Sequence, residues 1–425
     1  MRAYFLTGIL ILCIWESQSA NWQVCPECNC TTITEAIEAA NPGDALTIES
    51  GLYQEGRIIV NKPLFLQGKN YPRIDGKGMS EVLTIIADHV SVTGLQIQNV
   101  GHSYLEDRAG IRVQKAKHFV ICNNRLLNTF FGIYLEHAQY GLITNNHIEG
   151  QATEEMSSGN AIHLWYSKHV EIADNEISGH RDGIYFEFVD HSQVRRNNSH
   201  HNLRYGLHFM FSNDDEYHQN IFRENGAGVA VMFSKKIRLT ENQFIENWGR
   251  AAYGLLLKEI YDADITDNHF EHNTLGIHVE GCSRILYKAN TFLYNGWAMR
   301  VAGGCSKNEI KGNNFIDNTF DLAMNSQVGD NYFDGNYWSD YASYDLDRDG
   351  IGDVPHNPVK LFSYVVNQSP EAIMLLRSAF VDLINFSEKV SPVFSPPGLE
   401  DQQPHIRPFS QNFKTYADDS ASQDF

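Results

Sequence analysis

Residues 198–247 are NSHHNLRYGLHFMFSNDDEYHQNIFRENGAGVAVMFSKKIRLTENQFIEN. In this stretch an Asn returns every 22 residues, at Asn198, Asn220 and Asn242. Followed outward in both directions, the column has nine members separated by 22 to 29 positions: Asn124, Asn146, Asn175, Asn198, Asn220, Asn242, Asn268, Asn290 and Asn313. A sustained period of this length is typical of stacked repeats.

Each repeat also contains an alternating apolar pattern. About eight residues after most of these Asn, a small residue precedes an aliphatic one, as in Gly206-Leu207, and every second residue is then apolar, as in Leu207 and Phe209. A period of two places side chains on one face of a strand. Three short strands fit into 22 residues, and no segment has a helical pattern long enough for a crossover helix. The sequence therefore predicts an all-β fold, a right-handed parallel β-helix of ~22-residue coils whose Asn column forms an internal amide ladder.

Both ends of the solenoid carry predicted caps. Thr32-Ile33-Thr34-Glu35 is a capping box that predicts a short helix to Ala40 before the first coil. Near the other end, an amphipathic helix is predicted from Pro370 to Phe386, because its apolar residues fall on one stripe. That helix either covers the last coil or docks on a membrane partner. The residues of its stripe are Ile373, Leu376, Phe380, Leu383 and Ile384.

Composition and targeting signals limit the possible functions. The formal net charge of −19 and the lack of a basic patch argue against a nucleic-acid partner. The N-terminus has the pattern of a secretory signal, which predicts an exported, soluble mature protein. The expected organisation is a signal peptide over 1–20, a Cys-containing segment and cap helix over 21–44, the β-helix over 45–335, a cap with an Asp-rich loop over 336–369, the amphipathic helix over 370–390 and a disordered tail over 391–425.

Three cysteines follow the signal peptide closely. Cys25, Cys28 and Cys30 have the spacing C-x-x-C-x-C. In an oxidising compartment such a cluster forms a disulfide with one thiol left over. Alternatively, three thiolates bind a soft metal such as Cu(I). Further along, Cys282 and Cys305 are expected at nearly the same place on adjacent coils, where they either pair or stack.

The outward side chains of the alternating strands form two columns, and one region is unusual for a solvent-facing strand. Met210 and Met232 are 22 residues apart, so they should touch, and His208 points in the same direction as Met210. Two thioethers and an imidazole are suitable ligands for Cu(I). The alternative is that the two Met pack beneath an insertion loop. Clustered exposed Met and aromatic residues usually mark a binding surface.

An acidic motif precedes the helix. Asp345, Asp347, Asp349 and Asp353 take positions 1, 3, 5 and 9 of a calcium-loop pattern, with Gly350 at position 6. Position 12 is His356 instead of the bidentate Glu, and no paired helices flank the loop. We expect either a weak structural Ca²⁺ site or a Ca²⁺-free turn that closes the last coil.

A second functional hypothesis uses the outward carboxylates. Glu136, Glu187 and Glu280 would serve a secreted polysaccharide lyase or epimerase acting on uronate polymers. Such an enzyme needs a Brønsted base with cations close by. Arg112 and Lys258 are about six coils apart, and the sequence places no tight Asp cluster near them. The pattern therefore gives this enzymatic hypothesis little support.

Several stretches closely resemble the NosD family, and the resemblance extends over nearly the whole mature chain. They are residues 203–213, 228–234, 42–44, 336–340, 345–353 and 375–392. The resemblance implies a periplasmic, non-enzymatic accessory protein for maturation of nitrous-oxide reductase, at its copper–sulfur centre. It further implies that copper is carried transiently, or that transporter motion is coupled to the reductase.

The resemblance also implies partners. These are an ABC transporter of a permease and an ATPase, a copper-chaperone lipoprotein and the reductase itself, with the membrane reached only through the transporter. Under this interpretation His208, Met210 and Met232 are the copper candidates, with Cys25, Cys28 and Cys30 as weaker ones. The helix from Pro370 then docks on the permease.

Overall fold

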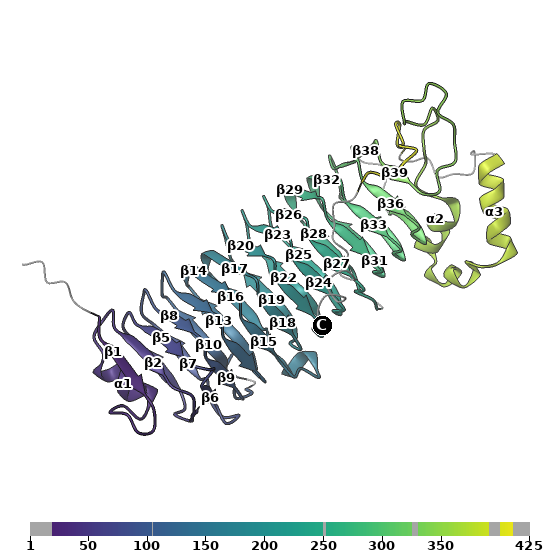
Figure 1. The fold of residues 1–425 in the computed structure, drawn as a ribbon. Helices are drawn as coiled ribbons and strands as arrows, with labels where there is room; N and C mark the ends of the chain where they lie inside the picture. The colour runs from purple at the N-terminus through teal and green to yellow at the C-terminus, as the bar shows by residue number, and fades with distance from the viewer. Residues whose placement is uncertain (1–18, 104, 250–251, 325–329, 391–399, 411–425) are drawn as a thin grey trace, which may run out of the picture.

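The computed structural model describes residues 19–103, 105–249, 252–324, 330–390 and 400–410. Three parallel sheets run along the length of an elongated solenoid, which confirms the predicted right-handed parallel β-helix (Figure 1). The predicted signal peptide falls almost entirely on residues 1–18, which lie outside the described residues. None of the described helices is long and apolar enough to cross a membrane.

Sheet A has 14 described strands, all parallel to their neighbours. In order along the sheet they are β1 (Asn21–Val24), β2 (Ala45–Ile48), β5 (Phe65–Gly68), β8 (Ser91–Thr93), β11 (Val120–Cys122), β14 (Gln139–Thr144), β17 (Lys168–Ala173), β20 (Gln193–Arg195), β23 (Glu216–His218), β26 (Arg238–Thr240), β29 (Tyr261–Thr266), β32 (Ser283–Lys288), β35 (Glu309–Lys311) and β38 (Tyr332–Asp334).

Sheet B has 13 described strands. They are β3 (Leu52–Tyr53), β6 (Arg73–Asp75), β9 (Gln96–Gln98), β12 (Arg125–Leu127), β15 (His147–Glu149), β18 (Glu176–Ser178), β21 (Asn198–His200), β24 (Ile221–Arg223), β27 (Gln243–Ile245), β30 (His269–Glu271), β33 (Thr291–Leu293), β36 (Asn314–Ile316) and β39 (Tyr337–Trp338).

Sheet C has 12 described strands and carries the alternating motif. They are β4 (Ile58–Val60), β7 (Leu83–Ile85), β10 (Ala109–Gln114), β13 (Phe131–Glu136), β16 (Ile162–Trp165), β19 (Asp182–Glu187), β22 (Tyr205–Met210), β25 (Ala227–Met232), β28 (Leu255–Lys258), β31 (Leu275–Glu280), β34 (Trp297–Val301) and β37 (Phe320–Met324). Strands β1 to β9 precede Asn124, the first Asn of the predicted column, so the first coils of the solenoid form without that signal.

The predicted Asn ladder exists and lies inside the solenoid. Each Asn side chain in it receives hydrogen bonds from the previous coil and donates to the next, as between Asn242 and Asn268 (3.0 Å). One predicted member is wrong: Asn197 is in the ladder, and Asn198 is on the outer face of β21. The inward position two residues later is therefore the fully buried Ser199, and His200 faces outward. The two adjacent Asn have identical side chains, so the spacing alone did not separate them.

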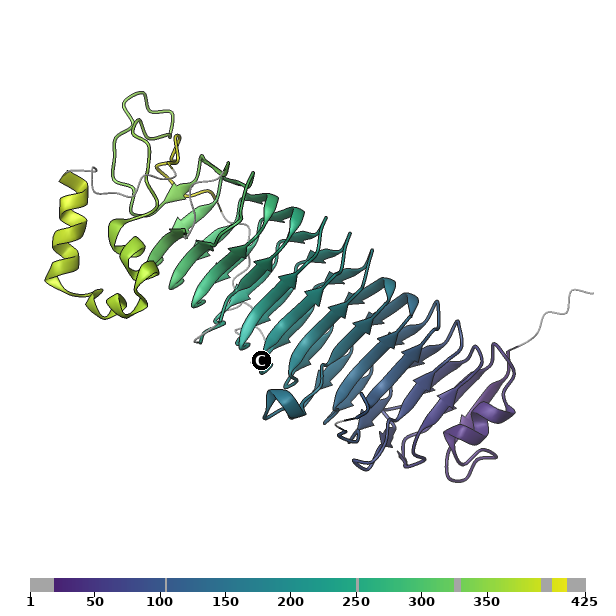
Figure 2. The same cartoon turned by 180° about the vertical axis from the view of Figure 1, so that it is seen from behind.

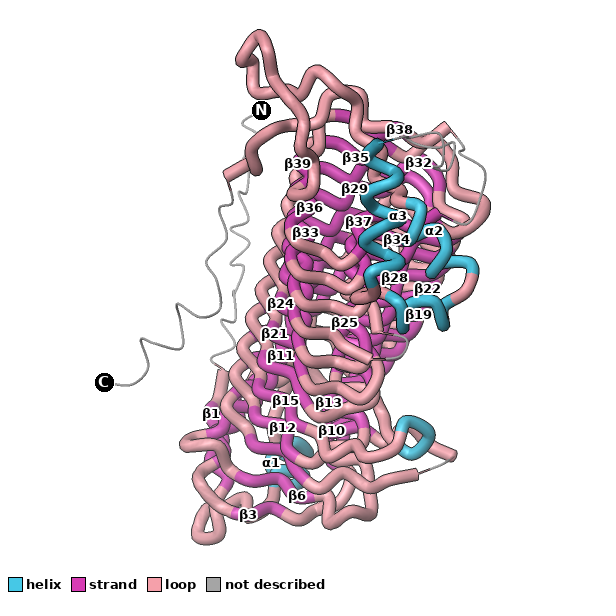
Figure 3. Tube along the Cα trace, turned by 90° about the vertical axis from the view of Figure 1, so that its right-hand side faces the viewer, coloured by secondary structure: helices cyan, strands magenta, loops and turns pink. Residues whose placement is uncertain are grey.

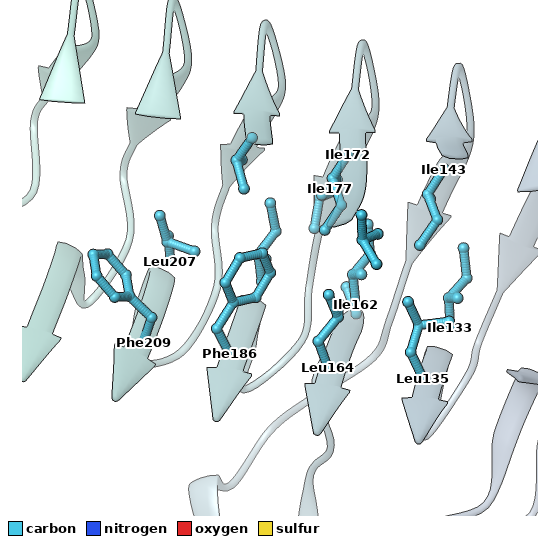
Figure 4. Packing of buried hydrophobic residues seen from close by; sticks show 14 of the residues in the cluster. Ile133, Leu135, Ile143, Ile162, Leu164, Ile172, Ile177, Phe186, Leu207 and Phe209 are labelled. Atoms are coloured by element: carbon cyan, nitrogen blue, oxygen red, sulfur yellow. The ribbon is translucent and has the colours of Figure 1, made fainter. Parts of the chain in front are cut away.

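The core fills the space between the three sheets. Figure 4 shows inward residues of sheet C, such as Ile133, Leu164 and Phe209, stacked coil upon coil. Ile133, Leu164 and Phe209 are fully buried. At the N-terminal end, α1 (Ile33–Ala39) closes the first coil, and its predicted capping box of Thr32 and Glu35 is confirmed. One insertion after β15 carries the short helix η1 (Glu155–Ser157), which projects from the side of the solenoid (Figure 2).

The C-terminal end differs from the prediction of a disordered tail over 391–425. Residues 400–410 return to the solenoid and close it, whereas 391–399 and 411–425 lie outside the described residues. Asp401 takes the place of the next ladder Asn and accepts hydrogen bonds from Asn336 N and Nδ2 and from Trp338 Nε1 (2.9–3.0 Å). A carboxylate accepts without needing to donate, so it satisfies the last coil and ends the ladder.

Helices occupy the segment between the last coil of the solenoid and residues 400–410. They are α2 (Leu361–Gln368), η2 (Pro370–Leu375) and α3 (Ala379–Val390). The predicted single helix from Pro370 is thus wrong in extent, since it is divided into a 3₁₀ turn and a separate α-helix. Figure 3 shows α2 and α3 beside the end of sheet C. Phe362 and Val366 of α2 and Val381 of α3 pack with Phe320 of β37.

Candidate metal centre

Met210 and Met232 lie side by side, as the 22-residue spacing predicts. They are paired residues at the ends of β22 and β25, one strand spacing (~4.8 Å) apart. Both side chains are half-buried. Their outer neighbours along sheet C are Glu187 and Lys258. The pair of thioethers is therefore reachable from solvent and bordered by one acid and one base.

His208 precedes Met210 by two residues and lies on the same face of β22. Its side chain is only 8% exposed. The ring contacts Tyr185 and Tyr205, with centroids 5.0 and 4.9 Å away. On one edge, Nδ1 lies 3.9 Å from Asp182 Oδ2 and 3.4 Å from an Arg204 nitrogen. On the other edge, Nε2 is buried and has no hydrogen-bond partner among the described residues. A buried polar atom without a partner is rare and calls for an explanation.

Asp182 provides the negative charge beside this imidazole. It is fully buried at the start of β19, and Arg204 binds both of its oxygens (2.9 and 2.6 Å). Burial alone would raise the pKa of Asp182, but hydrogen bonds from His208 and Arg204 outweigh it and lower that pKa. The carboxylate therefore stays ionised. Nδ1 lies 3.4 Å from the Arg204 guanidinium, which only donates, and 3.9 Å from Asp182, so the proton of the ring sits on Nε2 when Arg204 donates to Nδ1 and on Nδ1 when the ring turns that nitrogen to the carboxylate. In the second tautomer the lone pair of Nε2 is free for a metal, with the carboxylate behind the ring as in many metal-binding His.

The outward aromatic column next to His208 is buried, contrary to the expected exposure. Rings of adjacent coils cover one another: Tyr134 and His163 are 4.5 Å apart, and His163 and Tyr185 are 4.7 Å apart. Stacked rings of this kind exclude water from each other's faces. As a result, only Met210 and Met232, not His208, form the accessible part of the candidate site.

A second aromatic column, which was not predicted from the sequence, borders the two Met. We call Tyr166, Phe188, Phe211 and Phe233 the aromatic strip. Their rings stack at 4.5–5.2 Å and are partly exposed. In the coil after Phe233 the equivalent residue is Glu259, where the stack of rings stops. An open hollow of about 510 Å³ lies along this end of the strip and is lined by Phe188, Phe211 and Phe233 together with Lys235, Glu259 and Tyr261. The recurrence of Phe one residue after each Met was the available signal. Exposed apolar patches of this kind mark interaction surfaces.

Two buried histidines of the solenoid, His163 and His180, predict a pH dependence of stability. Burial lowers the pKa of His163 to about 3 and that of His180 to about 4, against about 6.5 when unfolded. Because the unfolded chain binds more protons below pH 6.5, stability falls as pH drops from about 6 to 4, by up to ~1.4 kcal/mol per pH unit for each His. Urea midpoints measured across this range should show that fall. His163→Phe should make it shallower, and the exposed His169→Gln should leave it unchanged. Equal slopes in all three proteins would contradict the assignment.

The carboxylates of the enzymatic hypothesis do not converge. Arg112 contacts Glu136 at 3.7 Å, and Lys258 contacts Glu280 at 3.3 Å. Glu187 lies beside Met210 in a different part of the sheet. These acids are thus spread along sheet C and partly neutralised by cations. They do not form the compact acid–base group that a lyase or epimerase requires.

The N-terminal cysteines are not arranged as a three-thiolate site. Cys25 and Cys28 form a disulfide, and Cys30 is a buried free cysteine. Cys282 and Cys305 are unpaired and stack, with the backbone N–H of Cys282 directed at Cys305 Sγ (3.5 Å). Burial raises the pKa of the Cys282 thiol to about 12, so it stays protonated and is a poor metal ligand.

The Asp-rich loop brings three of its four predicted residues together. Carboxylate oxygens of Asp345, Asp347 and Asp349 lie within 4.8 Å of one another. Asp353 instead accepts a hydrogen bond from the backbone N–H of Leu346 (2.7 Å). The neighbouring carboxylate of Asp349 raises the pKa of Asp347. Calcium at this loop stays a prediction from the sequence.

The predicted docking stripe divides into exposed and buried parts. Phe380 and Leu383 of α3 are 57% and 64% exposed, and Ile373 of η2 is also exposed. Leu376, in contrast, packs against the small core under α2 and α3. Further exposed apolar side chains extend the exposed part of the stripe: Met374, Leu375 and Phe386.

Comparison with known proteins identifies the family. Residues 148–343 match the family model of NosD, described as a periplasmic copper-binding protein. A Pseudomonas aeruginosa protein named as a probable ABC transporter binding protein, NosD, is 30% identical over 380 residues, covering 85% of this chain and 88% of its own length. The chain belongs to the NosD family. A NosD of the same description from Stutzerimonas stutzeri is 26% identical over 400 residues, covering 85% of this chain and 86% of its own length.

Solved structures agree with this chain in fold alone. The surface adhesin PfbA of Streptococcus pneumoniae matches with a TM-score of 0.50 at 13% identity, covering 76% of this chain and 91% of its own. DFA-IIIase from Arthrobacter chlorophenolicus A6 matches at 0.55 and 13% identity, covering 72% and 95%. An adhesin and an enzyme share this solenoid, so function has to be argued from the site.

Proposed function

We propose that this chain carries copper in the periplasm for assembly of the copper–sulfur centre of nitrous-oxide reductase, while bound to an ABC transporter. One observation carries the proposal: His208, whose Nε2 is buried without a hydrogen-bond partner among the described residues, precedes Met210 by two residues on the same face of β22, and Met210 pairs with Met232 of β25. The family description as copper-binding supports it. The role is a binding role, in keeping with the names given to the relatives.

The donor set suits Cu(I) as cargo. Thioethers and imidazole are soft to borderline ligands, and all three are neutral. A neutral set holds a monovalent ion without the strong charge attraction of thiolates, which favours release to an acceptor. The carboxylate of Asp182 lies 3.9 Å from Nδ1 of the imidazole. Under this proposal copper reaches the buried His208 through the half-buried Met210 and Met232.

Two surfaces support the proposed partners. The aromatic strip borders Met210 and Met232, so a copper-chaperone lipoprotein or the reductase docking there would meet the thioethers directly. The exposed apolar face of η2 and α3 lies at the far end of the solenoid from α1 and is suited to the permease (Figure 1). Under this proposal the permease, with its ATPase, binds the C-terminal end of the solenoid at η2 and α3. Copper is exchanged on the lateral surface of the solenoid, at Met210 and Met232.

An anaerobic Cu(I) titration against a competing chelator tests the proposal. The mature chain should bind one Cu(I), and Met210→Leu should weaken binding at least about tenfold, which is 1.4 kcal/mol. Met79→Leu is the matched control, because Met79 is an exposed thioether away from sheet C's Met pair. Equal affinity of wild type and Met210→Leu would remove the ligand assignment. Loss of binding only when Cys30 becomes Ser would move the site to the N-terminal segment.

A further inference from the structure

A second pair of imidazoles lies on sheet B, outside the Met site. His200 ends β21, and His201 follows in the turn with a left-handed φ of 51°. This backbone conformation turns the two side chains toward each other. Their Nδ1 atoms are 2.7 Å apart, and the ring planes are nearly perpendicular, at 84°.

Carboxylates occupy the far side of both rings. Nε2 of His200 is 2.6 Å from Glu176 Oε1, and Nε2 of His201 is 3.4 Å from Glu224 Oε2. Asn198 holds Glu176 in place, because its amide donates to both carboxylate oxygens (3.1 and 3.0 Å). Arg223 pairs with Glu224 at 2.7 Å. In space, the four groups therefore follow one another in the order Glu176 carboxylate, His200 imidazole, His201 imidazole and Glu224 carboxylate.

The proton positions decide what the two rings can hold. Nε2 of His200 is hydrogen-bonded to Glu176, which only accepts, so this nitrogen carries the ring's hydrogen and Nδ1 of His200 presents a lone pair to His201. The contact of His201 with Glu224 is an ion-pair distance and not a hydrogen bond, so His201 donates from Nδ1 to that lone pair in one tautomer and presents a second lone pair in the other. Two facing lone pairs repel, unless a cation or an additional proton lies between them. Carboxylate-backed His residues with converging free nitrogens are the usual surroundings of a bound metal.

We propose that His200 and His201 bind a borderline transition-metal cation, Cu²⁺ or Zn²⁺, through their Nδ1 atoms. Imidazole suits both ions. Glu176 and Glu224 against Arg223 leave one net negative charge beside the neutral rings, which favours a cation. His201 is 56% exposed, so its ring is free to turn and widen the Nδ1 separation to the ~3.3 Å that two ligands at ~2.0 Å from a tetrahedral metal need. Water completes the coordination.

Titration of the full mature chain with Zn²⁺ tests this site separately from the Met site, because thioethers are poor ligands for Zn²⁺. The wild-type chain should bind one equivalent of Zn²⁺ at this site. His200→Gln and His201→Gln should each weaken that binding at least about tenfold. His147→Gln is the control, since His147 also lies on sheet B with Glu149 at 3.5 Å. The Met210→Leu/Met232→Leu variant should bind Zn²⁺ as wild type does, whether or not it has lost Cu(I).

A spectroscopic measurement makes the test independent of affinity. Cu²⁺ added to wild type should give an electron paramagnetic resonance spectrum with nitrogen hyperfine splitting from two imidazoles, reduced in either His variant. Thermal midpoints close to wild type would show that the variants fold. Identical Zn²⁺ isotherms and identical Cu²⁺ spectra in wild type and both variants would overturn the proposal. Slow exchange of a shared proton between the rings, without metal uptake, would overturn it too.

Discussion

Replacing Asn197 with Ala is expected to lower the free energy of unfolding by about 3–6 kcal/mol, whereas replacing the adjacent Asn198 changes it by no more than about 1 kcal/mol. Asn197 is buried and accepts from Asn175 N and Nδ2 (3.0 and 2.9 Å). It also donates to Ile172 O and to Asn220 Oδ1 (2.9 and 3.0 Å). Its removal leaves several buried polar groups without partners, at about 1–3 kcal/mol each. The hydrogen bonds that the Asn198 side chain donates within the described part of the chain go to the surface residue Glu176.

Asn197→Ala and Asn198→Ala are matched variants, because the same side chain is replaced by the same residue at adjacent positions. Urea unfolding followed by circular dichroism should show a much lower midpoint for Asn197→Ala than for Asn198→Ala. Since solenoid coils are stabilised mainly by their neighbours, the Asn197 variant should also unfold over a broader range. Equal midpoints for the two variants would mean that the ladder contributes little to stability.

Phe380→Asp/Leu383→Asp is expected to reduce capture of the ABC permease more than about tenfold, without unfolding the chain. Both side chains are exposed on α3, whereas Val381 between them is buried. A carboxylate at these positions faces water in the free protein but must be desolvated at an apolar interface. The effect should therefore appear in binding and not in stability.

Co-purification of detergent-solubilised transporter with the tagged chain measures this binding. Asp382→Asn on the same helix is the control, since Asp382 is already polar and exposed. Undiminished capture by the double Asp variant would place the transporter contact elsewhere on the solenoid. A parallel loss of thermal stability would instead mean that this face packs within the protein.

The fold was predictable because its stabilising interactions repeat at a fixed interval. Equivalent residues of adjacent coils contact one another, as Asn220 contacts Asn242 and as Leu207 and Phe209 pair with residues 22 positions later. The interval in the sequence therefore predicts which residues stack in the structure. The closure by Asp401 was not predictable in this way. It occurs once, 65 residues from its partner Asn336, and no period leads to it.

The candidate site was predictable only in part, for the same reason. The pairing of Met210 and Met232 follows from spacing and is present. The partners of His208 do not follow: Asp182 comes from the preceding coil, and Arg204 from the turn before β22. Likewise, the contact between His200 and His201 depends on one left-handed backbone conformation, which neighbouring His residues do not reveal in sequence.

X-ray absorption on the anaerobic Cu(I)-loaded chain, with selenomethionine in place of Met, tests the copper proposal most directly. Selenium distinguishes a methionine ligand from a cysteine ligand, which sulfur does not. Copper should have two selenium neighbours and one nitrogen neighbour, and the selenium signal should be absent from Met210→Leu/Met232→Leu. Copper surrounded only by nitrogen, oxygen or sulfur in the labelled wild-type chain would contradict the copper proposal.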